Sequence, residues 1–173
     1  MRFETEQLGV DVCSRPLTLA YHGRFDGTAS AAAVGLQYAR NLGGGSDNNE
    51  GAYVANRVGA GRRWEAWRYN LDGARRIAPV TLNLRMRGQF ANEPLVPGEQ
   101  FGFGGATSVR GLREREVSGD YGYTIALEAV APLPWEDFSA LVFFDRGVAR
   151  RKNSQPGEWG TRRPPAWDWA YAG

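Results

Sequence analysis

The chain has 173 residues, of which 42% are hydrophobic, and its 21 basic and 19 acidic residues give a formal charge of +2. So small a charge excess argues against a nucleic acid as partner. No stretch approaches the roughly 18 continuous apolar residues of a membrane-spanning helix, although the mean hydropathy of −0.47 also suits the alternating strands of a membrane barrel.

The start of the chain, Met-Arg-Phe-Glu-Thr-Glu, lacks the apolar core of a secretory signal. We therefore expect a piece of a longer protein whose natural N-terminus is missing. The alternating run Trp167–Gly173 stops abruptly, so we expect the C-terminus to be truncated as well.

Most informative windows alternate apolar and polar residues with a period of two, as half-buried strands do, and few carry a helical apolar stripe. In chain order we expect strands at Phe3–Val12, Leu17–Phe25, Ala29–Leu42, Ala52–Gly61, Arg63–Ile77, Thr81–Ala91, Tyr121–Ala129, Phe138–Asp145 and Trp167–Gly173.

The clearest of these strands is Thr81–Ala91. One face carries its apolar residues and the other the polar residues Asn83, Arg85, Arg87 and Gln89. A strand of this length, at ~3.4 Å per residue and tilted by ~40°, rises ~28 Å, which is close to the apolar band of an outer-membrane barrel.

Aromatic residues stand near several predicted strand ends, where the interfacial girdle of a barrel places them. They are Tyr21, Phe25, Tyr53, Trp64, Phe90, Trp135 and Phe138. The alternative is that they form the core of a β-sandwich.

Three polar connections interrupt the strand pattern. Residues 43–49 form a glycine-rich loop, and Lys152–Ala166 forms a proline-containing one. The third, from Asn92 to about Gly119, shows no sustained strand pattern. A connection of that length is usually functional, and in barrels it includes extracellular loops that fold back into the lumen.

Two charged residues in this region have unusual surroundings. Arg110 stands among the glycines and small residues of Gly104–Leu112, and Asp145 faces the polar side of an otherwise apolar strand. An enclosed carboxylate needs a partner, and an arginine supplies one in bidentate geometry. The alternative is that both residues are solvated and do not meet.

Four segments in order carry a resemblance to a known family. They are Arg87–Gly105, which includes Glu93-Pro-Leu-Val-Pro-Gly-Glu-Gln-Phe101, then Ser108-Val-Arg-Gly-Leu112, Ser118-Gly-Asp-Tyr-Gly-Tyr123 and Phe143-x-Asp145-x-Gly147. Over roughly residues 60–150 the chain resembles the haemolysin secretion/activation transporters of the ShlB/FhaC/HecB type, the pores of two-partner secretion.

The resemblance implies an all-β fold, a sixteen-stranded antiparallel outer-membrane barrel that follows periplasmic POTRA domains. The chain would be the C-terminal part of the barrel domain, with roughly eight or nine strands and a long loop inserted in the lumen. The POTRA domains and the first and last barrel strands would be absent.

The family's motifs also imply site residues. They give Val109, Arg110, Gly111 and Leu112 for the loop tip and Phe143, Asp145 and Gly147 for the barrel wall. In the family the motif arginine pairs with the aspartate. Leu112 stands where tyrosine or phenylalanine is usual, a departure that affects packing at the tip and leaves the ion pair unchanged.

The implied function is transport of an unfolded partner exoprotein across the outer membrane, with membrane lipid around the barrel. Lumen-facing polar residues, Arg85, Arg87, Gln89 and Glu128, would solvate the passing chain. We expect no enzyme activity, cofactor, metal or small-molecule substrate. Cys13 and His22 are the chain's only cysteine and histidine, so neither a disulfide nor a zinc cluster forms within it.

Two other functions stay open. One is the related insertion factor that assembles outer-membrane proteins, which shares the Val-Arg-Gly and aspartate motifs; the Glu93–Phe101 segment favours secretion. The other is a soluble β-sandwich binding module.

Overall fold

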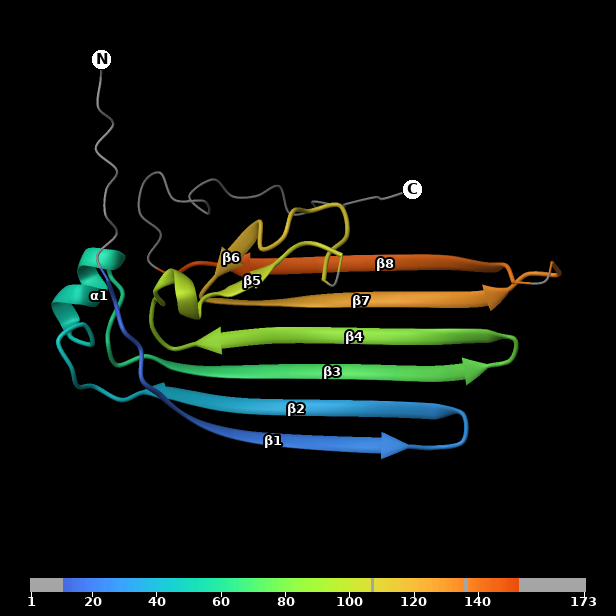
Figure 1. Ribbon diagram of the computed structural model, residues 1–173, viewed down its shortest axis with the longest axis horizontal. Helices are drawn as coiled ribbons and strands as arrows, with labels where there is room; N and C mark the ends of the chain where they lie inside the picture. The colour runs from blue at the N-terminus through green and yellow to red at the C-terminus, as the bar shows by residue number, and fades with distance from the viewer. Residues whose placement is uncertain (1–10, 107, 136, 153–173) are drawn as a thin grey trace, which may run out of the picture.

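The structure is a computed structural model that describes residues 11–106, 108–135 and 137–152. Six long strands form one antiparallel sheet in the order β1-β2-β3-β4-β7-β8, seen side by side in Figure 1. Their bounds are β1 Pro16–Asp26, β2 Ser30–Asn41, β3 Glu65–Ile77, β4 Val80–Ala91, β7 Tyr121–Pro132 and β8 Ser139–Arg150.

These six strands match six of the predicted ones within a few residues, except that β8 extends five residues beyond the predicted end at Asp145. The predicted strand Trp167–Gly173, most of Phe3–Val12 and nearly all of the polar tail 152–166 lie outside the described residues. Within the described residues the sheet thus has six long strands, whereas the sequence predicted eight or nine strands over the whole chain.

The predicted strand Ala52–Gly61 is wrong, because the helix α1 (Glu50–Asn56) stands in its place. Asn49 caps this helix: its side-chain oxygen accepts a hydrogen bond from the Ala52 amide at 3.0 Å. Glu50 adds a negative charge in the first turn, where the helix dipole favours it. Two turns are too short to show an apolar stripe in the sequence.

The connections differ sharply between the two ends of the sheet. At one end the strands join through short turns at residues 27–29, 78–79 and 133–138. At the other end residues 42–64 hold α1, and residues 92–120 hold η1 (Pro97–Glu99), β5 (Phe101–Phe103) and β6 (Val117–Gly119). Strands β5 and β6 pair with each other and lie over β7 and β8 (Figure 1).

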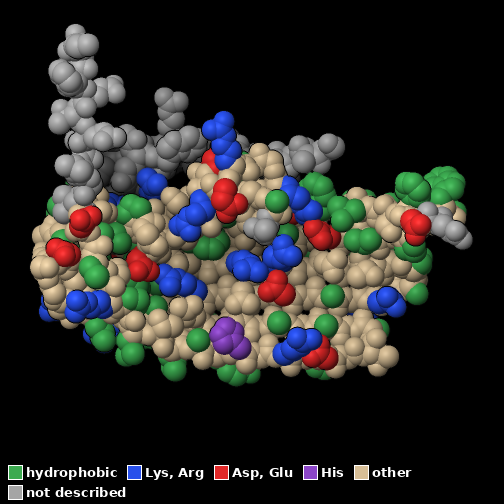
Figure 2. Space-filling model, viewed as in Figure 1, with side chains coloured by type: hydrophobic (Ala, Val, Ile, Leu, Met, Phe, Trp, Pro, Cys, Tyr) green, Lys and Arg blue, Asp and Glu red, His purple; other side chains and the backbone are tan. Residues whose placement is uncertain are grey.

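The strand register sorts side chains onto two unlike faces. Asp72, Arg85, Ala126 and Asp145 are cross-strand neighbours in one row. In the next row Leu71, Met86 and Ile125 point to the opposite side, because successive residues of a strand alternate. The polar face is the one seen in Figure 2, where charged side chains gather over the middle of the sheet and hydrophobic ones lie mainly along the rim.

The opposite face is apolar, and none of the described segments covers it. Large side chains there are widely exposed, including Leu19 at 74% and Val142 at 71%. Monomeric soluble proteins rarely expose a contiguous apolar surface of this kind. Within the described ranges no helix is both long and apolar enough to cross a bilayer.

A small buried core lies at the end of the sheet that carries the long connections. It consists of Ala39, Tyr53, Ala60, Trp64, Ala66, Ala91, Leu95 and Val96. Two of the aromatic residues expected in a girdle, Tyr53 and Trp64, are instead fully buried here. Tyr21, Phe25, Phe90, Trp135 and Phe138 are more than half exposed.

Asn41 fixes the connection that carries α1. Its side-chain amide donates to Asn48, to the Tyr53 hydroxyl and to the Arg62 carbonyl at 2.8–3.0 Å, and its side-chain oxygen accepts from the Arg15 amide at 2.7 Å. A buried amide with every group paired stabilises a single arrangement of the segments it joins.

Candidate functional site

The candidate site is the contact between the long loop and the polar face of the sheet. The loop leaves β5 through Gly104 and Gly105, whose φ angles of +132° and +87° suit glycine alone. The Ser108 hydroxyl closes this turn, since it lies 2.8 Å from both the amide and the carbonyl of Gly104. The turn points the following residues toward β8.

Arg110 is the residue that meets the sheet. Its Nε donates to Asp145 Oδ2 at 2.7 Å and its Nη2 to Oδ1 at 2.7 Å, a bidentate ion pair. Its backbone amide also donates to Oδ2 at 3.0 Å. The structure therefore brings together the two charged residues that the motifs single out.

Two further residues of the sheet surround the same guanidinium. Arg110 Nη1 donates to Glu128 Oε1 at 2.7 Å, and the guanidinium carbon lies 3.6 Å from the centre of the Phe143 ring. Hydrogen bonding to Asp145 raises the pKa of Arg110 above its ordinary value, so the side chain keeps its charge at every physiological pH. Glu128 was predicted as a lumen-facing residue, and its pairing with Arg110 was not foreseen.

The other tip residues divide between contact and exposure. Val109 is buried, Leu112 is half-buried, and Gly111 is exposed with a φ of +93°. Leu112 stands at the tip position where the family usually has tyrosine or phenylalanine. The aromatic contact with Arg110 comes instead from Phe143 on β8.

A second contact seats the loop beside the ion pair. Gly147 has no side chain, and a Cβ there would come within 2.4 Å of the Phe103 ring. Phe103 is buried on β5. The glycine of the wall motif therefore leaves the space in which the ring of the loop lies.

The predicted lumen-facing residues stand on the polar face, but they do not share one environment. Arg85 and Arg87 are exposed and lie 3.5 and 3.7 Å from the Asp72 carboxylate. Gln89 is buried instead of exposed: it accepts from Arg68 and donates to the Glu99 carbonyl. The segment around η1 covers it.

A second ion pair, between Arg57 and Asp120, lies at the base of the loop and was not predicted. Its partners are 63 residues apart, and Arg57 falls in the segment mistaken for a strand. The only signal was the Ser-Gly-Asp segment at 118–120, to which the family resemblance assigns no role.

Comparisons with known proteins show which family the chain belongs to. The family model of the haemolysin secretion/activation protein ShlB/FhaC/HecB matches residues 17–161. The chain belongs to this family. The resemblance inferred from the four motifs is thereby confirmed.

Among solved structures, CdiB from Acinetobacter baumannii is similar to this member of the haemolysin secretion/activation family, with a TM-score of 0.59 and 26% sequence identity. The match covers 81% of this chain and 24% of the CdiB chain. No curated protein sequence was found to match.

The docked loop leaves part of the polar face open. A hollow of about 460 Å³ lies beside it, lined by residues that include Arg24, Asp26, Asp72, Arg85 and Glu128. Charges of both signs line it. Among the residues that the structure describes, no group of His, Cys, Asp and Glu side chains could hold a metal ion.

Proposed function

We propose that this chain is part of an outer-membrane barrel that secretes a partner polypeptide by two-partner secretion, without cofactor or bond chemistry. The observation that carries the proposal is the loop docked on the polar face, with Arg110 held by Asp145, Glu128 and Phe143 in a member of the haemolysin secretion/activation family.

The two faces of the sheet support a barrel wall. An uncovered apolar face suits lipid, and a polar face suits an aqueous lumen. The connections are short at one end of the sheet and long at the other, which supports an orientation of the sheet in the membrane. Outer-membrane barrels have short periplasmic turns and longer extracellular loops. The end with α1 and the docked loop would then be extracellular, and the loop would reach into the lumen.

The docked loop must move for a polypeptide to pass, because a wide barrel conducts only when its lumen is clear. The loop tip is suited to such movement. The side chains of Arg110 and Glu128 are 23% and 28% exposed, so water can replace their contact as it breaks. Asp145 is 2% exposed, but both of its oxygens accept from Arg110, so withdrawal of the loop opens this carboxylate to the lumen. The open hollow beside the tip adds space for an extended chain.

Charge reversal in the full-length protein tests the proposal. Arg110→Asp and Asp145→Arg should each reduce secretion of the partner exoprotein at least tenfold, because each places like charges where the ion pair stood. Secretion is measured as exoprotein in the culture medium against exoprotein retained in the periplasm. Combining the two substitutions should recover part of the lost secretion.

Arg113→Asp is the matched control, since Arg113 lies in the same loop and its side chain is exposed. It makes the same change of charge away from the wall and should leave secretion unchanged. If both reversals at Arg110 and Asp145 secrete as well as this control, the docked loop has no part in secretion.

The related insertion factor is the second candidate, because it shares the Arg110 and Asp145 motifs. Deleting the gene separates the two functions. Loss of one exoprotein from the medium, with normal levels of other outer-membrane proteins, supports secretion; a general fall in outer-membrane proteins supports insertion. A soluble β-sandwich would need two large packed sheets, and the described residues contain one large sheet and the short β5–β6 pair.

A further inference from the structure

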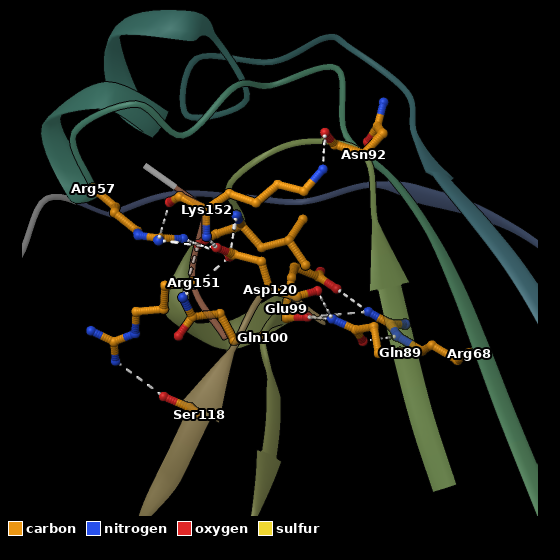
Figure 3. Close-up of polar contacts among 11 residues, drawn as sticks. Arg57, Arg68, Gln89, Asn92, Glu99, Gln100, Ser118, Asp120, Arg151 and Lys152 are labelled. Carbon is orange, nitrogen blue, oxygen red and sulfur yellow. Dashed lines mark hydrogen bonds and ion pairs between the residues drawn. The ribbon is translucent and has the colours of Figure 1, made fainter. Parts of the chain in front are cut away.

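Asp120 is a fully buried carboxylate at the base of the docked loop (Figure 3). Its Oδ1 accepts from Arg57 Nη1 at 2.6 Å and from the Leu95 amide at 2.8 Å. Its Oδ2 accepts from Arg57 Nη2 at 3.1 Å and from the Lys152 amide at 2.7 Å. Gln100 adds a longer contact at 3.4 Å.

These donors come from separate parts of the chain. Arg57 follows α1, Leu95 follows β4, and Lys152 follows β8. Arg57 also donates to the carbonyls of Leu95 and Lys152, at 2.7 and 3.1 Å. One ion pair therefore joins both ends of the loop to the α1 connection and to the end of β8.

The backbone is tightly packed at the same place. A Cβ at Gly119 would lie 2.6 Å from the carbonyl oxygen of Arg150 and 2.7 Å from its nitrogen, and the Asp120 amide donates to that carbonyl at 2.9 Å. The Ser118 hydroxyl accepts from Arg151 at 3.2 Å. Residues 118–120 thus lie against the end of β8 without a gap.

The two ion pairs of the loop differ in exposure. At the base, the Arg57 and Asp120 side chains are 5% and 0% exposed. At the tip, Arg110 is 23%, Glu128 is 28% and Asp145 is 2% exposed. Separation at the base leaves two charges that water cannot reach. At the tip, water already reaches Arg110 and Glu128, and Asp145 is covered by the Arg110 contacts that leave with the loop.

We propose that the Arg57–Asp120 ion pair is the fixed base of the loop, so that the loop opens from its tip. Arg110 leaves the sheet, residues 104–106 and 108–116 move, and residues 95–100 and 118–120 stay in place. Arg57 and Asp120 are positioning residues. The proposal rests on the proposed function only in that secretion requires the loop to move.

Hydrogen exchange of the full-length protein in lipid vesicles tests this order of opening. Mass spectrometry would follow peptides covering residues 93–100, 104–116 and 117–124. In the unmodified protein the tip peptide should exchange at least tenfold faster than the two base peptides, since exchange reports local opening. Equal rates in all three peptides would overturn the proposal.

Variants at each anchor sharpen the test. Arg110→Ala should accelerate exchange in the tip peptide and leave both base peptides unchanged. Asp120→Asn should accelerate exchange in all three peptides by about a hundredfold. Arg57→Lys is the milder variant, to be used if Asp120→Asn fails to fold. It should accelerate exchange in the same peptides by about tenfold. Asp137→Asn, an exposed site in the short turn between β7 and β8, is the control and should change none.

Two outcomes contradict a fixed base: faster exchange in the base peptides of Arg110→Ala, or unchanged base peptides in Arg57→Lys. Neither measurement uses secretion. If the charge reversals at Arg110 and Asp145 leave secretion intact while the exchange pattern holds, the proposed function fails and the fixed base stands.

Discussion

The Phe103 ring occupies the space that a side chain at Gly147 would need. The two residues come from different parts of the site, one from β5 of the loop and the other from the motif of the wall on β8. Their contact lies two residues from Asp145, so the apolar and charged contacts of the loop are neighbours on the same strand.

We expect Gly147→Ala to displace Phe103 and weaken loop docking, because the new Cβ would lie 2.4 Å from a buried ring. Overpacking of this kind costs ~1–3 kcal/mol. Gly73→Ala is the control, since its nearest atoms lie at 4.0 Å. Thermal unfolding of the full-length protein should show the loss for Gly147→Ala alone. Equal melting temperatures for the two variants would contradict the prediction.

The tip ion pair should respond unequally to loss of either partner. Arg110→Met leaves Asp145, whose side chain is 2% exposed, beside Glu128 with no cation between them. We expect a loss of ~3 kcal/mol in the free energy of unfolding. Asp145→Asn keeps the Glu128 contact and an acceptor oxygen, so we expect ~1 kcal/mol. Urea unfolding in lipid vesicles measures both, and the reverse order would count against this geometry.

Gly111 should be required for its backbone conformation rather than for space. Its φ is +93°, and nothing lies within 4 Å of a Cβ built there. Gly111→Ala should cost ~1–2 kcal/mol, the penalty of a left-handed conformation. Gly98 is equally open but has no positive φ, so Gly98→Ala should cost nothing measurable. The two melting temperatures decide between conformation and space.

The apolar face should reject charge in the membrane. Leu84 and Asn83 are neighbours on β4 but point to opposite faces, and Asn83 stands across from Glu128. Leu84→Arg should cost ~2–4 kcal/mol if it lies near the bilayer midplane. Asn83→Arg gains an acidic neighbour and should be tolerated. The amount of folded protein in the outer membrane, seen as heat-modifiable migration, compares the two; equal amounts would place the apolar face outside lipid.

The clearest strand could be predicted because apolar and polar residues alternate along almost its whole length. Thr81–Ala91 was predicted within one residue of β4 (Val80–Ala91). The strand predicted at residues 52–61 was wrong for a physical reason. Tyr53, Val54 and Val58 favour strands, and the helix that Asn49 caps is too short to show a helical period in the sequence. Tyr53 belongs to the core because of that helix, which is why the girdle prediction was wrong for it.

The candidate site was predictable where a motif names its residues. Arg110 and Asp145 are 35 residues apart, and nothing in their local patterns brings them together; the ordered family motifs did. No family motif assigns a role to Phe103 or Asp120. Their roles depend on which backbone segments lie against Gly147 and Arg150. The periodicity of the sequence carries no information about these contacts.

Among the described residues, the buried core cluster lies at the end of the sheet with the long connections and includes Ala39, Trp64 and Leu95. A sheet normally completes its fold by packing against a second layer of protein. Toward the short turns at 27–29 and 78–79, no part of the chain that the structure describes forms such a layer on the apolar face. If that face lies in lipid, the bilayer is the missing layer. The packing of the sheet is then supplied by the chain at the end with the long connections and by lipid at the end with the short turns. On extraction into water, the strands should therefore separate first at the short turns.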